Sequence, residues 1–349
     1  MIPPKTGRQE MTDFVSRMRI SVQAFKRGKL LQFVAFLLMI IGLALAVPPS
    51  DSLAQQAHNR DGGIGGTGIV FGPVDRLGSI VVNGMRIETA NARLSSFPNR
   101  LGGGAVETGD TVFASIRSSA SGPSANRVVR FYPISGPVTS AGRGAIEVMG
   151  TRVDIPAGTP VVDFTGSAVR LRAGDTVRVS GLWRGQRIVA SRVVKAPNVP
   201  VTLSGQFRPV GTGNGVGSTR VEMRQDFALG AFVTIRGRFD GSTLAAERVS
   251  QTLPLRLDRQ TGLLSAQGFL ARDFAGSGYH LSGFGLPMNQ ASPVGRQTGI
   301  RSVFFGVVSG GYLIEDRVSL PDSAAARRQE LDSLRPTEVP GNWRAFYQR

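Results

Sequence analysis

The chain has 349 residues, with 41 basic and 24 acidic side chains, a net charge of +17 and no cysteine. The lack of cysteine excludes disulfides, thiolate nucleophiles, iron–sulfur clusters and the usual cysteine-containing zinc sites. Its 45 glycines are about 13% of the residues, against a usual share of about 7%, which predicts an unusually large number of turns.

The first predicted element is an apolar run, residues 30–47, which carries no charge and follows Lys26, Arg27 and Lys29. A basic flank, an apolar run and small residues before a cleavage point are typical of a secretory signal, here with cleavage after Ala54. A helix of this length would extend about 27 Å, close to a bilayer core of roughly 30 Å, so an uncleaved anchor is the alternative. In either case the basic flank stays cytoplasmic and the bulk of the chain is exported to the periplasm.

A glycine-rich segment, residues 55–68, follows the leader 1–54 and contains the run GGIGGTG at 62–68. A phosphate-binding glycine loop follows a strand and opens a helix, so that helix amides meet the phosphate. This run instead precedes a predicted strand. We therefore interpret it as a flexible linker.

Four segments after the linker share two markers at a constant distance. In each segment a glycine precedes an arginine, and the interval between the two is the same in all four. The glycines are Gly109, Gly174, Gly230 and Gly299, and the arginines are Arg127, Arg192, Arg248 and Arg317. Such self-similarity indicates a repeated structural unit. We predict four β-units, at residues 69–133, 134–198, 199–254 and 255–320.

A β-hairpin explains why this interval is constant while the rest of the unit varies in length. One extra residue in a paired strand would turn every later side chain to the opposite face, whereas loops absorb insertions. We predict hairpin turns from Gly181 to Gly185 and from Gly237 to Gly241, with these glycines supplying positive φ angles.

A second hairpin is predicted upstream in each unit, most clearly at Asn83-Gly84, and Met149-Gly150 is its counterpart in the second unit. With a leading strand, each unit would have about five short strands, which must close or pack to hide their edges. The predicted fold class is all-β: a tandem array of about four small five-stranded OB-like barrels after the signal or transmembrane helix. The last segment, 321–349, is predicted to contain a short helix at 323–334, which Pro336 ends.

The run from Gly72 to Glu88 (GPVDRLGSIVVNGMRIE), followed by Gly109–Val112 (GDTV), resembles the bacterial family DUF5666, a domain of unknown function. The resemblance is good over residues 69–130, fair over 134–195 and weak over 201–318. It implies an exported, repeated, small β-domain. It supplies no catalytic residue, because the family has no established activity.

Few side chains are candidates for chemistry. His58 and His280 each stand alone in the sequence, so we expect structural or exposed roles for both. Asp110 and Asp175 follow marker glycines, and we interpret them as turn caps that accept hydrogen bonds from backbone amides. We predict no catalytic, metal or cofactor site and a protein that is not an enzyme. A carboxylate-dependent hydrolase would need two carboxylates close together in one cleft.

Trp183, Arg184 and Arg187 form the one candidate ligand surface. An aromatic side chain flanked by arginines at a hairpin tip could stack on a sugar or base and contact anions. Packing of Trp183 between units is the alternative interpretation. Because residues 1–54 carry seven basic and three acidic side chains, cleavage after Ala54 would leave a net charge of +13, which favours polyanionic partners.

The predicted function is therefore a binding or scaffolding role, without catalysis, in the bacterial cell envelope. Its partner would be an envelope polymer or a protein, with the membrane as a further partner through residues 30–47 if that run is uncleaved. The alternative is a polyanion binder that holds an anionic glycan or nucleic acid on an OB-like face. No specific nucleic acid is expected.

Overall fold

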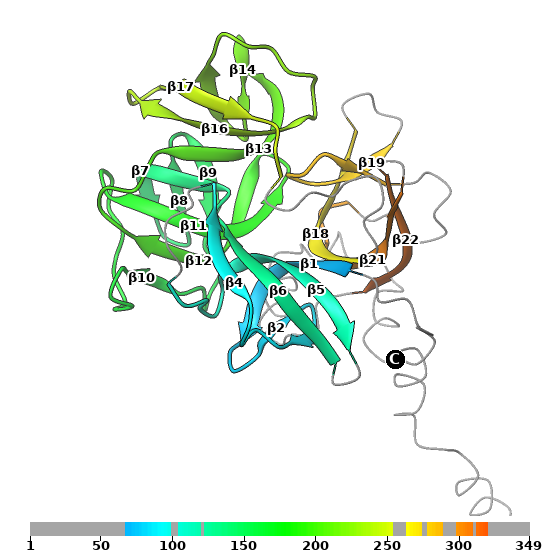
Figure 1. The fold of residues 1–349 in the computed structure, drawn as a ribbon. Helices are drawn as coiled ribbons and strands as arrows, with labels where there is room; N and C mark the ends of the chain where they lie inside the picture. The colour runs from blue at the N-terminus through cyan, green and yellow to red at the C-terminus, as the bar shows by residue number, and fades with distance from the viewer. Residues whose placement is uncertain are drawn as a thin grey trace, which may run out of the picture. The chain divides into compact units, whose positions relative to one another are not determined.

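The protein is described by a computed structural model (Figure 1), which covers residues 67–98, 104–119, 122–253, 263–273, 278–288, 298–309 and 312–319. All of these residues belong to one unit of the chain, Gly65–Arg349. They form 22 strands and no helix, which confirms the predicted all-β class for this part of the chain. Among the described residues, no helix is long and apolar enough to span a membrane.

Several predicted elements lie outside the described residues. They are the leader 1–54 with its apolar run 30–47 and Ala54, most of the linker 55–68, and the C-terminal helix 323–334. These elements stay predictions.

Five strands of the second predicted unit close into a barrel. They are β7 (Ile134–Gly142), β8 (Ala145–Val148), β9 (Thr151–Asp154), β11 (Thr176–Arg184) and β12 (Arg187–Lys195). β7 pairs antiparallel with β8 and β11, β9 joins β8 antiparallel and β12 parallel, and the β11–β12 hairpin completes the ring. A sixth strand, β10 (Val161–Asp163), adds to β12 in parallel. Because side chains alternate between the two faces of a strand, one apolar set fills the barrel, including Val148, Val177 and Ile188.

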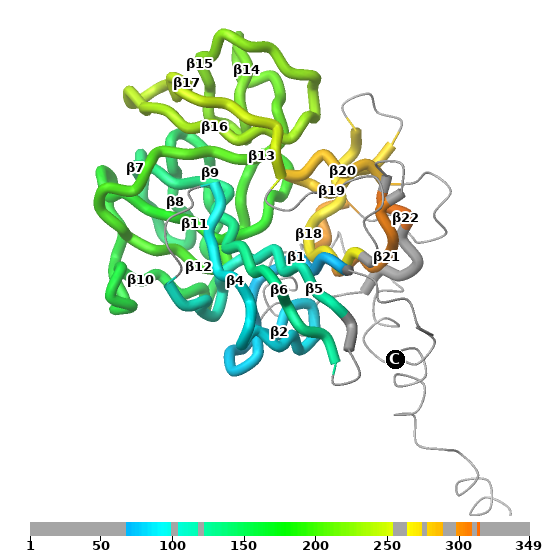
Figure 2. Tube along the Cα trace, viewed as in Figure 1, coloured from blue at the N-terminus to red at the C-terminus, as the bar shows by residue number. Residues whose placement is uncertain are grey.

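The next five strands pair in the same order. They are β13 (Thr202–Val210), β14 (Gly213–Val216), β15 (Thr219–Glu222), β16 (Phe232–Phe239) and β17 (Thr243–Ser250). β13 pairs antiparallel with β14 and β16, β15 joins β14 antiparallel and β17 parallel, and the β16–β17 hairpin completes the ring. β13 also pairs with β7, so both groups of strands belong to one continuous sheet (Figure 2).

The first and fourth predicted units supply the remaining strands. The first contains β1 (Thr67–Arg76), β2 (Ile80–Val82), β3 (Met85–Ile87), β4 (Arg93–Phe97), β5 (Thr111–Ser119) and β6 (Gly122–Phe131). The fourth contains β18 (Leu263–Arg272), β19 (Tyr279–Leu281), β20 (Leu286–Pro287), β21 (Arg301–Ser309) and β22 (Tyr312–Ser319). Isolated parallel bridges, Glu88 to Ser124 and Met288 to Leu313, connect the third strand of each group to its last one. β1 and β18 pair in parallel, which joins the two groups in a second sheet.

The four long hairpins share one irregularity of register. Each marker arginine lies opposite a residue of the preceding strand, and the pairs are Ser115 with Arg127, Ser180 with Arg192, Arg236 with Arg248 and Phe305 with Arg317. Directly after each pair, the register of the two strands shifts by one residue. The extra residue is a β-bulge at the same place in every hairpin. The constant interval between glycine and arginine therefore corresponds to a constant strand pairing.

The predicted extent of the hairpin turns is wrong. β11 continues to Arg184 and β16 to Phe239, so the turns lie only around Gly185 and Gly241, which have φ angles of 63° and 105°. Gly181 and Gly237 lie inside the strands, next to the bulge, and neither has a positive φ. A Cβ at Gly181 would stand 2.5 Å from the carbonyl oxygen of Val189. Close approach of the partner backbone, rather than turn geometry, explains these two glycines.

A cluster of phenylalanines connects strands from three of the predicted units. The ring of Phe284, which follows β19, lies 4.5 Å from Phe71, 5.5 Å from Phe113 and 5.9 Å from Phe131, between ring centroids. Phe232 of β16 stacks on it at 6.1 Å. Leu182 and Val189 of the β11–β12 hairpin belong to the same buried cluster, so all four predicted units contribute to it.

Candidate functional site

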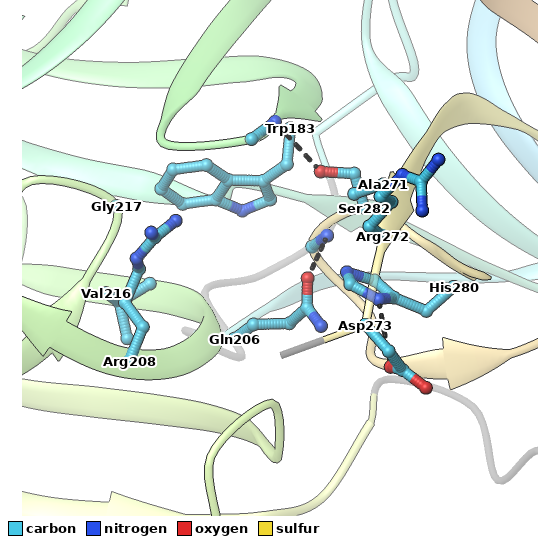
Figure 3. A pocket seen from close by; sticks show the side chains of 12 residues that line it. Trp183, Gln206, Arg208, Val216, Gly217, Ala271, Arg272, Asp273, His280 and Ser282 are labelled. Carbon is cyan, nitrogen blue, oxygen red and sulfur yellow. Dashed lines mark hydrogen bonds and ion pairs between the residues drawn. The ribbon is translucent and has the colours of Figure 1, made fainter. Parts of the chain in front are cut away.

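A cavity of about 220 Å³ lies where the β11–β12 turn, the strands β13 and β14, and the strands β18 and β19 meet. We call it the junction cavity. Figure 3 shows Arg208 on one side of this space and Arg272 and His280 on the other. Its lining is about equally polar and apolar and comprises Trp183, Gly185, Gln206, Arg208, Val216, Gly217, Ala271, Arg272, Asp273, His280, Ser282 and Gly283.

The indole of Trp183 forms one wall of the junction cavity. Only 3% of Trp183 is exposed, and its Nε1 donates a hydrogen bond to the backbone oxygen of Ser204 at 2.9 Å. Gly205, Gly217 and Gly283 lie so close to the ring that a Cβ at any of them would collide with it. These three glycines come from two other predicted units. The indole is thus fixed by packing and by the hydrogen bond that a buried tryptophan requires.

Two side-chain hydrogen bonds fix the turns around the cavity. The amide of Gly283 donates to Oε1 of Gln206 at 3.0 Å, which ties the turn after β19 to β13. The amide of Gly185 donates to Oγ of Ser282 at 3.1 Å, which ties the β11–β12 turn to the same region. Because both bonds join segments far apart in the sequence, the cavity depends on the packing of three units.

His280 and Asp273 face each other at the edge of the cavity. Nδ1 of His280 lies 3.3 Å from Oδ1 of Asp273, and the histidine is 3% exposed. Burial lowers the pKa of the imidazole, and the nearby carboxylate opposes this effect in part. Because the ordinary pKa of histidine is about 6.5, the lowered pKa favours the neutral form of His280 at pH 7.

Two of the lining residues are arginines. Arg208, on β13, is half-buried, and burial lowers the pKa of its guanidinium. Arg272, at the end of β18, is exposed, and its guanidinium carbon lies 5.6 Å from the ring centroid of Tyr279. Arg272 pairs with Tyr279, whereas Ala271 pairs with His280, so the Arg272 side chain lies on the face of β18 and β19 opposite that of His280.

The predicted ligand surface is not assembled as an exposed platform. Trp183 is buried, which fits its interpretation as a packing residue between units. Arg184, its neighbour on β11, points to the opposite face, where its guanidinium carbon lies 5.4 Å from the ring centroid of Phe269. Arg187 is exposed, and its Nη1 lies 3.5 Å from Oδ2 of Asp154. Only Trp183 of the three lines the junction cavity.

The predicted capping role of Asp110 and Asp175 is confirmed. Oδ2 of Asp110 accepts a hydrogen bond from the amide of Glu107 at 3.0 Å, and Oδ2 of Asp175 accepts one from the amide of Arg172 at 2.9 Å. Burial raises the pKa of Asp110, whereas the hydrogen bond from Lys195 lowers the pKa of Asp175. The two carboxylates cap equivalent turns and differ in how far water reaches them.

No group of three or more histidine, aspartate or glutamate side chains converges as metal ligands would within the described part of the chain. A second cavity, of about 650 Å³, lies on the barrel of β7–β12 and has a different lining. Its walls are mainly apolar, from Ile146, Ile155, Val161, Val169 and Leu171, with Arg143 and Arg170 as the charged residues.

The comparison with known families agrees with the resemblance found in the sequence. A model of the domain of unknown function DUF5666 matches residues 135–194, which correspond to the closed barrel of β7–β12. On sequence grounds the resemblance to this family is good over residues 69–130 and fair over 134–195. The family model instead matches the second predicted unit. No curated protein and no solved structure shows significant similarity to the chain.

The sequence does not predict the junction cavity as a site. Gln206 and Arg208 lie in no motif, and the adjacent pair Arg272-Asp273 is expected from the sequence to be turn and rim residues; the two segments line one cavity although they are far apart in the chain. Of the lining residues, only Trp183 and His280 are candidates on sequence grounds. A local pattern cannot reveal such a site, because nothing local requires these side chains to be neighbours.

Proposed function

We propose that the chain is an exported, non-catalytic β-domain protein of the bacterial cell envelope, with a binding or scaffolding role. In this proposal, four tandem OB-like units at residues 69–133, 134–198, 199–254 and 255–320 follow the leader. The shared bulge register of the four hairpins and the two groups of strands that close in the same order support the repeat. The leader supports export.

The observation that carries the binding role is the way in which the units are joined. Strand pairing between β7 and β13 and between β1 and β18, together with the cluster around Phe284, makes the described strands a single framework. Such a framework holds side chains from separate units in fixed positions, as a binding site requires. The junction cavity is built in this way.

Export is tested by fractionating bacteria that express the full chain. We expect the protein in the periplasm or the inner membrane, and its length distinguishes cleavage after Ala54 from a retained anchor. The variant Leu37→Arg/Leu38→Arg should stay in the cytoplasm, because two charges interrupt the apolar run, whereas the control Thr6→Arg should behave as the natural chain. Cytoplasmic accumulation of the natural chain would refute export. The scaffolding role is tested by cross-linking intact cells. If the protein is recovered only in its unlinked form, the scaffolding role is refuted.

A second candidate function is the binding of an anionic glycan or another polyanion. It is favoured by Arg236 and Arg248, which lie directly opposite each other on β16 and β17 and are both exposed. Like charges in this arrangement destabilise a hairpin, so an anionic partner would relieve their repulsion. Salt-dependent retention on immobilised heparin tests this candidate.

A further inference from the structure

We propose that the barrel of β7–β12 binds a single-chain amphiphile with an anionic head, a carboxylate or a phosphate, in the second cavity. We call this cavity, of about 650 Å³, the barrel cavity. All of its lining lies within residues 135–194, so the site belongs to the domain that the family model matches and not to a junction between units. The inference rests on the proposed binding role and names the ligand class of one site.

The apolar walls of the barrel cavity continue the core of the barrel. Ile146 lies directly opposite Ala141 on β7 and Val153 on β9, so the three side chains share one face of the sheet. Val153 and Ile146 are buried, whereas Ala141 is exposed. A second row reaches the cavity through Val161, which lies opposite the buried Val193. An alkyl chain in this space would therefore pack against the outer end of the core and leave water.

Backbone hydrogen bonds hold the walls in place. The amide of Ile155 donates to the carbonyl oxygen of Gly144 at 2.7 Å, which ties the segment after β9 to the β7–β8 turn. The amide of Val169 donates to the carbonyl oxygen of Val161 at 3.1 Å, which ties the segment before β11 to β10. Walls that are already ordered bind a ligand at a smaller cost in conformational entropy.

The charge of the barrel cavity favours an anionic head group. Arg143, in the β7–β8 turn, and Arg170, before β11, are the charged residues of the lining, and both are exposed. Neither forms an ion pair with another residue in the described part of the chain. Asp163, at the end of β10, accepts hydrogen bonds from the amides of Thr165 and Ser167, so its carboxylate serves its own turn. An arginine beside an apolar wall can pack its stem there while its charged end meets a carboxylate or phosphate in water.

The size and the walls of the barrel cavity limit the ligand further. Its volume falls within the range of roughly 300–1,000 Å³ that is usual for pockets of small molecules. The apolar walls disfavour a polysaccharide or a nucleic acid, because these would lose hydration without gaining hydrogen bonds. The two arginines disfavour a cationic amphiphile. An alkyl chain with a negatively charged end satisfies both conditions.

Calorimetric titration of the purified full chain, in the form in which cells produce it, tests the ligand class. The probes are laurate, dodecyl phosphate and dodecyltrimethylammonium, which carry alkyl chains of similar length and are used below the concentrations at which they form micelles. Acetate serves as an anion without the chain. We expect laurate or dodecyl phosphate to bind at least about tenfold more tightly than the cationic probe, and acetate not to bind. Binding of one anionic probe alone would identify its head group, and equal binding of both would show that the negative charge is what is recognised.

The variant Ala141→Trp locates the site. Ala141 is exposed and shares a face with Ile146, so the indole would occupy the barrel cavity without replacing a core side chain. Binding of the anionic probes should weaken about tenfold or more. The matched control is Ala245→Trp, the same change at an exposed position on β17 outside the cavity, which should bind as the natural protein does. Both variants keep the leader, so any binding of probe by the leader would be equal in the two.

Replacement of the arginines tests the preference for an anion. Arg143→Gln/Arg170→Gln should weaken binding of laurate and dodecyl phosphate about tenfold and leave binding of dodecyltrimethylammonium unchanged or stronger. The control Arg220→Gln/Arg236→Gln, in which two exposed arginines outside the cavity are replaced, should bind as the natural protein does. The unfolding temperature without probe shows whether each variant has folded, and we expect no change for these exposed positions.

Three results would overturn the inference: no binding of either anionic probe, binding of the cationic probe as tight as that of the anionic ones, or undiminished binding by either cavity variant. These results are separate from those of fractionation and cross-linking. A protein that is exported and cross-linked but binds no anionic amphiphile would retain the proposed function and lose this ligand class.

Discussion

Arg236 and Arg248 show how much the position of a residue in a hairpin determines its surroundings. The two guanidinium-bearing residues are cross-strand partners, and both are exposed. In the first and second units the residue opposite the marker arginine is Ser115 or Ser180, so neither of these units has the charge that Arg236 places in the third. Exposed basic pairs of this kind attract polyanions through a field that salt screens.

We predict that Arg236→Ser lowers the salt concentration at which the protein elutes from immobilised heparin. The substitution removes one charge of the pair and introduces the residue that two other units carry at this position. Stability should stay equal or rise slightly, because the cross-strand repulsion disappears. Arg187→Ser is the matched control, since Nη1 of Arg187 already faces Asp154. Elution of the natural protein without retention, or an equal effect of the control, would contradict this prediction.

Some residue roles are predictable from the sequence and others are not. The capping by Asp110 and Asp175 follows from local chain geometry, so the sequence can reveal it. The burial of Trp183 depends on Gly217 and Gly283, which belong to other units, so the sequence alone allows both a packed and an exposed indole. The presence of Arg208 and His280 in the lining of one cavity depends on long-range packing in the same way.

At the scale of the element, the hairpin with its bulge is the best-defined feature of the chain. Gly237 lies next to the bulge of the β16–β17 hairpin, and the carbonyl oxygen of Ala245 occupies the place where a Cβ would be. In the first unit Ile116 stands next to the corresponding bulge. The need for glycine therefore comes from the close backbone approach in particular hairpins and not from the bulge itself.

We predict that Gly237→Ala lowers the free energy of unfolding by about 1–3 kcal/mol, because the strands must move apart to admit the methyl group. Urea unfolding followed by circular dichroism measures the change. Gly142→Ala is the control: this glycine also lies in a strand, its φ is not positive, and a Cβ there would be 3.6 Å from the nearest atom. The control should be neutral or slightly stabilising. Equal losses in both variants would show that the close approach at Gly237 has no particular importance.

Strand pairing within a hairpin is predictable from the sequence, and pairing between units is not. The constant interval between glycine and arginine constrains register, since one inserted residue would turn later side chains to the opposite face. No comparable pattern shows that β7 pairs with β13 or that β1 pairs with β18. Both pairings join the leading strands of two units, and the sequence does not specify which leading strands pair with each other.

At the scale of the whole molecule, the phenylalanine cluster is one of the contacts between the groups of strands. The ring of Phe284 packs against Phe71, Phe113 and Phe131 of the first predicted unit and against Phe232 of the third. Aromatic pairs with tilted or edge-to-face geometry add to the stabilisation that burial already gives. Separate groups of strands are thereby coupled through one side chain.

We predict that Phe284→Ala lowers the free energy of unfolding by about 3–5 kcal/mol, as loss of a large buried aromatic side chain does. Chemical denaturation should show the loss as a lower midpoint. Phe164→Ala is the matched control, because Phe164 is 71% exposed and its loss should change stability by less than about 0.5 kcal/mol. An unchanged midpoint for Phe284→Ala would mean that the cluster does not couple the units.

The parallel pairing of β1 with β18 has a consequence for the order in which the protein forms. Ile69 pairs with Leu264, and the second and third predicted units lie between these two partners in the chain. The ribosome makes the earlier strand first, and contacts over such a separation form slowly. Until Leu264 has been synthesised, that side of β1 offers unpaired amides and carbonyls to any other extended peptide. This edge of the nascent chain is therefore open to mispairing for most of the time that the chain is being synthesised. A chaperone that holds unfolded chains would act on this edge.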